Sequence, residues 1–185
     1  MVEQLVERIR QKDQQTERQR AMSQLYQMYV EELSSVCYRY VPDENDAKDV
    51  LQSSFVKIFT SMQDFEYRDE PSFRGYLVKV VVNEALSFLR ERKRLLFVNL
   101  DEAAIEQAAA DEEPKPNGIT ADELHQLISE LPDGYRTVVN LHVFEGYSHQ
   151  KIAELLGITE STSGSQLYFA KRLLAKKIKE LMNNR

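Results

Sequence analysis

Hydrophobic residues recur every three or four positions along most of this chain, a spacing that predicts helices. A short pattern over residues 2–9 predicts an amphipathic helix that either docks on a neighbour or frays. A longer stripe over residues 21–40 stops before a proline and predicts a core helix. Two further stretches, residues 47–62 and 75–94, keep the same spacing. The first half of the chain is therefore expected to be a helical domain.

The last third of the chain has the same helical spacing with clear start and stop signals. Thr120 and Glu123 form a capping-box pair ahead of one helix, and residues 132–134 are expected to form a turn before the next. Ser148 and Thr159 are positioned to cap two further helices, and Gly157 between them supplies a left-handed residue. Two helices joined by such a turn predict either a helix-turn-helix, which places its second helix in a major groove, or a plain helical hairpin.

A change of composition separates these two parts. Residues 98–119 are acidic and rich in alanine, contain two prolines and have too few apolar side chains for a core. We expect a flexible linker there. Because no segment has the alternation of a strand, the sequence predicts an all-α chain with a helical domain at residues 1–97, the linker at 98–119 and a second helical domain at 120–185.

The charge distribution supports this division. The chain carries a net charge of -6, and residues 98–123 alone, with 8 acidic residues and 1 basic residue, account for the excess. The flanking domains are thus free to present basic faces to phosphate. There is no apolar run of membrane-spanning length and no signal-peptide pattern, so we expect a cytoplasmic protein without membrane insertion. The single cysteine, Cys37, lies in an apolar stripe and is expected to be a buried structural thiol.

Three groups of residues have candidate chemistry. Asp46, Asp49 and Gln52 share one helix face, which is either solvated or meets a basic partner. Aromatic residues in the stretch 63–73 suit either unstacked bases or a core. The stretch 90–94 contains four cations, which are favoured by the helix dipole and also suit phosphate. The three histidines, by contrast, have no metal-ligand spacing, so we expect no catalytic activity, no cofactor and no metal.

Taken together, these motifs resemble one family. The first half contains LYQMYVEELSSVCYRYVPDENDAKDVLQSSFVKIF followed by FRGYLVKVVVNEALSFLRERKR, and the second contains LISELPDGYRTVVNLHVFEGYSHQKIAELLGITESTSGSQLYFAKRLL. In this order they resemble regions 2 and 4 of a bacterial RNA polymerase sigma factor of the extracytoplasmic function (ECF) group. A helix-turn-helix alone is shared by many regulators, whereas its pairing with DAKDVLQSSF is specific. The alternative without this pairing is a stand-alone helix-turn-helix transcriptional regulator.

The resemblance implies a site for each partner. The surface for the core polymerase β′ subunit would comprise Asp46, Asp49, Gln52 and Phe55. The -10 promoter DNA would meet Phe65, Tyr67, Arg74, Tyr76, Asn83, Arg90, Arg92, Lys93 and Arg94. The -35 DNA would meet Thr162, Ser163, Ser165, Gln166, Tyr168 and Lys171. The linker would thread through the polymerase, which includes the β subunit, and an anti-sigma factor is expected as a regulatory partner.

The chain departs from the family pattern at several positions. Tyr76 stands where tryptophan is common, and Lys151 replaces a glutamate that would complete a capping box with Ser148. Gly164 and Phe169 occupy positions where the family commonly has Arg or Lys facing DNA. The resemblance therefore implies that -35 recognition is weakened or shifted onto neighbouring side chains.

Overall fold

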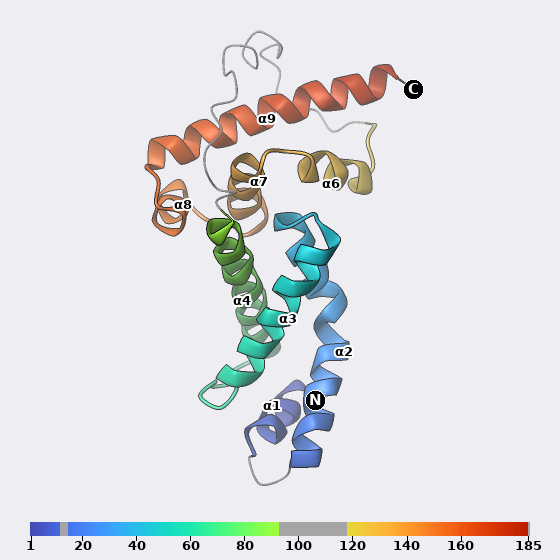
Figure 1. Cartoon of the computed structure of the whole chain (residues 1–185), viewed down its shortest axis with the longest axis vertical. Coiled ribbons are helices and arrows are strands. Elements are labelled where there is room, and N and C mark those ends of the chain that lie inside the picture. Colours follow the sequence, from blue (N-terminus) through green and yellow to red (C-terminus); the bar gives the residue numbers. More distant parts are fainter. Residues whose placement is uncertain (12–14, 93–117, 185) are drawn as a thin grey trace. The chain divides into compact units, whose positions relative to one another are not determined.

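The computed structural model describes residues 1–11, 15–92 and 118–184, and the chain divides into two compact units, Met1–Glu91 and Arg92–Arg185 (Figure 1). Every regular element within the described ranges is a helix, which confirms the predicted all-α class. Of the expected linker, only Gly118 and Ile119 lie among the described residues, so the domain limits remain predictions. None of the helices in these ranges is long and apolar enough to cross a bilayer.

The described part of the first unit consists of α1 (Val2–Arg10), α2 (Gln15–Tyr40), α3 (Glu44–Ser61) and α4 (Glu70–Glu91). Helices α2, α3 and α4 pack against one another, and α1 packs against α2 (Figure 1). The apolar stripes seen in the sequence form the core, and its fully buried side chains include Leu25, Leu33, Ile58, Met62, Leu77 and Leu89. Burying each such side chain contributes about 1.5 to 3 kcal/mol.

Two features of this unit settle expectations from the sequence. The apolar residues of α1, from Val2 to Ile9, are all buried, so this helix docks rather than frays. Cys37 is also fully buried, as predicted, and its thiol donates to the carbonyl oxygen of Ala47 on α3 at 3.4 Å. Both observations show contacts with α2, the longest described helix of the unit: α1 packs on it, and α3 accepts a hydrogen bond from it.

Helix α4 begins five residues earlier than its apolar spacing predicted. Its start is fixed by Asp69, whose carboxylate accepts from the backbone N–H of Ser72 at 2.7 Å and whose carbonyl accepts from Phe73 at 3.1 Å. Pro71 fits in the first turn because an N–H there would have no partner within the helix. As a result, Phe73 belongs to the helix and is buried, instead of lying in a loop.

The described part of the second unit contains α6 (Ala121–Ser129), α7 (Asp133–Val139), the π-helix η1 (Asn140–Phe144), α8 (His149–Leu156) and α9 (Glu160–Asn183). The predicted capping box is present, because Thr120 and Glu123 each accept from the other's backbone N–H. The caps of the helix-turn-helix are present too. Ser148 accepts from Lys151 N–H at 3.2 Å, Gly157 has φ +67°, and Thr159 accepts from Thr162 N–H at 3.0 Å.

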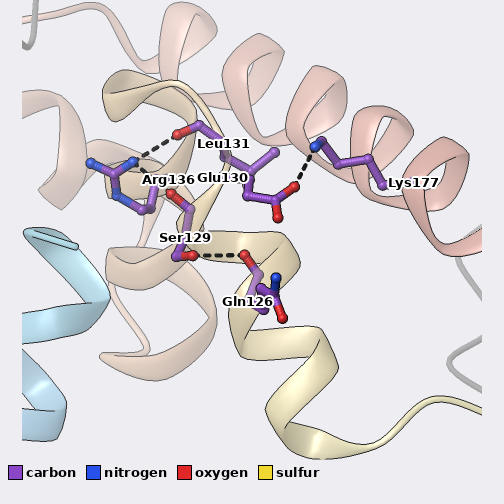
Figure 2. Close-up of polar contacts among 6 residues, drawn as sticks. All are labelled: Gln126, Ser129, Glu130, Leu131, Arg136 and Lys177. Carbon is purple, nitrogen blue, oxygen red and sulfur yellow. Dashed lines mark hydrogen bonds and ion pairs between the residues drawn. The ribbon is translucent and has the colours of Figure 1, made fainter. Parts of the chain in front are cut away.

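The joint between α6 and α7 differs from the predicted turn at residues 132–134, because α7 already begins at Asp133. Its geometry depends on Arg136, which is only 4% exposed. The Arg136 guanidinium donates to the carbonyl oxygens of Leu131 at 2.7 Å and Ser129 at 3.2 Å (Figure 2). It also pairs with the Asp133 carboxylate. The bond to Ser129 satisfies a carbonyl at the end of α6 that the helix itself leaves without a partner, and the bond to Leu131 satisfies a carbonyl between the two helices.

Candidate functional site

The α3 surface expected to meet the polymerase is formed in part. Asp49 and Gln52 are exposed, whereas Asp46 is nearly buried at the start of the helix. Phe55 is buried, since its ring packs 4.6 Å from Tyr26 on α2 and 5.8 Å from Phe59, measured between centroids. Its ring belongs to the α2–α3 contact, and its assignment to the polymerase surface stays a prediction.

Val56 on α3 was missed by the sequence reasoning. It is 60% exposed, and it follows Gln52 by four residues, so both lie on one face of α3. Asp43 fixes the start of this helix by accepting from the N–H groups of Asn45 and Asp46 at 3.0 and 2.9 Å. The exposed side of α3 thus combines one carboxylate, one amide and one apolar side chain on a capped helix.

An aromatic cluster surrounds the first turns of α4. Phe73 lies at its centre and is fully buried, with the rings of Phe65 and Tyr67 at 5.4 and 5.9 Å between centroids. Tyr76 lies 4.6 Å from Phe65, and its hydroxyl bonds to that of Ser61. Phe73 belongs to the core, whereas the rings of Phe65, Tyr67 and Tyr76 are half-buried and keep part of their surface in solvent. Stacking of these three rings on unpaired bases stays a prediction.

Polar and basic residues lie on the same unit. Arg74 is exposed, and its pKa is raised by a hydrogen bond of 2.8 Å to the Glu32 carboxylate on α2. Asn83 is exposed on α4, and so are Arg90, which donates to Ser87 Oγ at 3.3 Å, and Arg92. Lys93 and Arg94 lie outside the described residues. The predicted cations and amide thus lie at the surface where they are described.

Tyr29, part of the core stripe that the sequence predicts for α2, also belongs to this cluster. It is buried next to Phe73, and burial raises the pKa of its phenol, as do the nearby carboxylates of Glu70 and Glu32. Its spacing in α2 matches the core stripe, so no sequence signal distinguishes it from its neighbours. The aromatic cluster therefore extends from α4 into α2.

Helix α9 presents fewer of the predicted -35 residues than expected. Ser165, Tyr168 and Lys171 are exposed, and Thr162 is half-buried. Ser163 and Gln166 are buried on the side of the helix that carries Leu167, so the expectation that they face outward is wrong. Ser163 is small enough to fit there, and its hydroxyl bonds to Nδ1 of His149 on α8 at 2.9 Å.

Gly164 and Phe169, the two positions of α9 that depart from the family pattern, differ in how far they are buried. Gly164 is half-buried in helical conformation, and a Cβ added there would meet nothing within 4 Å. Phe169, in contrast, is only 8% exposed, so the side chain at this position does not face outward. Its ring packs edge to face on that of Tyr168, with centroids 5.3 Å apart and planes at 74°.

Two of the histidines form an unpredicted contact between η1 and α8. The rings of His142 and His149 stack with centroids 4.6 Å apart and planes 5° apart, and Nδ1 of His142 lies 2.9 Å from the Tyr147 carbonyl oxygen. Within the described residues, no three His, Cys, Asp or Glu side chains gather as metal ligands would. These histidines are accordingly part of the packing of the helix-turn-helix.

Two family models match separate parts of this chain. The Sigma-70 region 2 family model matches residues 25–95, and the Sigma-70 region 4 model matches residues 121–174. The ECF RNA polymerase sigma-E factor of Haemophilus influenzae is 28% identical over 96% of this chain and 95% of its own. The RNA polymerase sigma-H factor of Pseudomonas aeruginosa is 28% identical over 97% and 95%.

Among solved structures, the sigma factor RpoE of Bartonella quintana, crystallised with the anti-sigma factor NepR, aligns with a TM-score of 0.49. It is 16% identical over 85% of this chain and 96% of its own. In the sequence, the two family regions occur in the predicted order, one in each compact unit. This chain belongs to the sigma-70 family and is a sigma factor of the ECF type.

Proposed function

We propose that this chain directs core RNA polymerase to specific promoters, with the first unit binding the polymerase and the -10 element and the second binding the -35 element. The family match of each unit supports this assignment. The single observation that carries it is the presence, in one chain, of an exposed polar face on α3 and a capped helix-turn-helix. A stand-alone regulator would need only the second of these.

The polymerase surface that we propose consists of Asp49, Gln52 and Val56 on α3. These side chains combine a charge, an amide and apolar surface, which suits contact with a protein. Protein interfaces have an apolar centre surrounded by polar contacts. Asp49 would meet a basic group of the β′ subunit. An anti-sigma factor that covered this face would compete with the polymerase, and this partner remains a prediction.

The -10 surface that we propose is the aromatic cluster at the start of α4 together with the cations at the end of this helix. Half-exposed rings stack on unpaired bases, with each stack contributing about 1 to 3 kcal/mol. Arg90 and Arg92 near the end of α4 would contact the phosphates of the same strand. Rings that are held by packing would favour a separated strand over a duplex, because only separated bases expose their faces.

The experiment that tests this function is run-off transcription with purified core polymerase on a library of promoter fragments. The wild-type chain is compared with an Asp49→Arg, Gln52→Ala variant and with a control variant, Glu31→Arg, which reverses an exposed charge on α2 outside the proposed surface. We expect promoter-specific transcripts from the wild type and the control and few from the α3 variant. Duplex DNA binding without any polymerase binding would leave the stand-alone regulator as the better explanation.

A further inference from the structure

We propose that Tyr168, supported by Phe169 and Arg172, recognises the 5-methyl group of a thymine in the duplex -35 element. This inference rests on the proposed function and names the base chemistry that the second unit would recognise. It also gives a reason for the aromatic residue at position 169. Phe169 is buried and does not contact DNA in this proposal; its ring supports Tyr168, which makes the contact.

The ring of Tyr168 is exposed but held on two sides. It is 47% exposed, and its edge-to-face contact with the buried ring of Phe169 supports it from within the unit. On its other side, the Cζ atom of Arg172 lies 5.2 Å from the Tyr168 ring centroid, and the same guanidinium donates to the Tyr168 hydroxyl. A large side chain fixed in this way loses little conformational entropy when it meets a partner.

The position of Tyr168 on α9 suits a duplex. It shares a helix face with the exposed residue Ser165, three positions earlier, and with Arg172, four positions later. This face adjoins the first two turns of α9, the part of a recognition helix that enters a major groove. Gly164 presents no side chain beside it, so nothing at that position holds the helix away from the base edges.

The chemistry of the ring selects the group that it would contact. In the major groove, thymine differs from the other bases by its C5-methyl group, which apolar and aromatic side chains contact directly. A paired base in a duplex exposes only its edge, so stacking on the Tyr168 ring is not available there. The Tyr168 hydroxyl accepts from Arg172, and the carbon surface of the ring is the part of the side chain that would contact the methyl group.

The test replaces each thymine of the -35 element by deoxyuridine, one at a time, in a double-stranded promoter fragment obtained from the transcription library. Binding of the holoenzyme to each labelled fragment is measured by fluorescence anisotropy. We expect the wild type to lose about fourfold in affinity at one position, which is the value of one buried methyl group. Tyr168→Ala should show no difference between thymine and deoxyuridine at that position, while Tyr168→Phe should keep it.

Phe169 and Arg172 are positioning residues in this proposal. The ratio of the affinities for the thymine and deoxyuridine fragments tests them too. Phe169→Leu and Arg172→Gln should reduce the thymine-to-deoxyuridine ratio at the one position, whereas a general folding defect would weaken binding to all fragments alike. A -35 element without thymine, or a ratio unchanged in Tyr168→Ala, would overturn the inference while leaving promoter-specific transcription intact. Loss of the transcripts themselves from the wild type would instead overturn the proposed function, and the inference with it.

Discussion

The guanidinium of Arg74 donates a 2.8 Å hydrogen bond to the carboxylate of Glu32, which joins the first turn of α4 to the middle of α2. Arg74 lies one residue after Phe73, the centre of the aromatic cluster. A phosphate that approached Arg74 would therefore compete with Glu32 for the same guanidinium. The negative charge of Glu32 would also repel the DNA backbone.

Glu32→Gln should consequently strengthen binding of the holoenzyme to a single-stranded oligonucleotide with the -10 sequence, by roughly two- to fivefold, the range expected when an exposed ion pair is released. Arg74→Ala should weaken it. Fluorescence anisotropy at low and at physiological salt measures both effects. If Glu32→Gln strengthened binding equally in a chain that also carries Arg74→Ala, the gain would come from general charge removal, and the proposed competition would be wrong.

Two glycines of the helix-turn-helix should respond to alanine in opposite directions. Gly164 lies in helical conformation inside α9, and its added Cβ meets open space, so Gly164→Ala should stabilise the chain by about 1 kcal/mol. Gly157 has equal space but φ +67°, and Gly157→Ala should destabilise it by roughly 1 to 2 kcal/mol. Urea unfolding followed by circular dichroism measures both. Equal signs for the two variants would contradict the backbone argument.

Arg136 should be far more important for stability than a cation of the same region that lies at the surface. Arg136→Met removes a buried charge that satisfies two carbonyl oxygens and one carboxylate, and we expect a loss of roughly 3 to 5 kcal/mol. The matched control is Lys177→Met, which removes the 2.6 Å pair with Glu130 and should cost at most about 1 kcal/mol (Figure 2). The midpoint temperatures of thermal unfolding of the two variants measure this difference. Similar midpoints would show that Arg136 does not stabilise the connection between α6 and α7.

Cys37 should make stability depend on alkaline pH. Burial raises the pKa of its thiol from 9.0 to about 12, so the thiol ionises first in the unfolded chain. Its contribution to stability is complete below pH 9 and is lost as the pH rises toward 12. The stability difference between wild type and Cys37→Ala should therefore shrink by about 1 kcal/mol between pH 8 and pH 10 in urea titrations. A constant difference over this range would contradict the prediction.

The sequence predicted helices, caps and cores well because each of these depends on neighbours along the chain. The left-handed Gly157 and the capping threonines at 120 and 159 are local features, and they occur as expected. The early start of α4 was missed because Asp69 and Pro71 stand in a charged stretch without apolar spacing. A helix-start signal was present there, but the aromatic residues nearby favoured a loop.

The surfaces were harder to predict because orientation depends on contacts between helices. Ser163 and Gln166 have the polar character of exposed residues, yet they lie on the inner face of α9, where Ser163 bonds to His149. Phe55 was assigned to a docking surface by resemblance, whereas its ring fits against Tyr26 of another helix. Such contacts join residues 14 to 29 positions apart, and periodicity within one helix does not determine them.

Each of the two units has its own buried core, with Leu33 and Leu77 in one and Leu131 and Leu141 in the other. Leu33 and Leu77 lie in the part of the sequence that matches region 2, and Leu131 and Leu141 lie in the part that matches region 4. We therefore expect the two units to be interchangeable between relatives. Hybrid proteins that exchange the second unit for that of a relative should keep their -10 preference and acquire a new -35 preference, which offers a route to artificial promoter sets that do not cross-react.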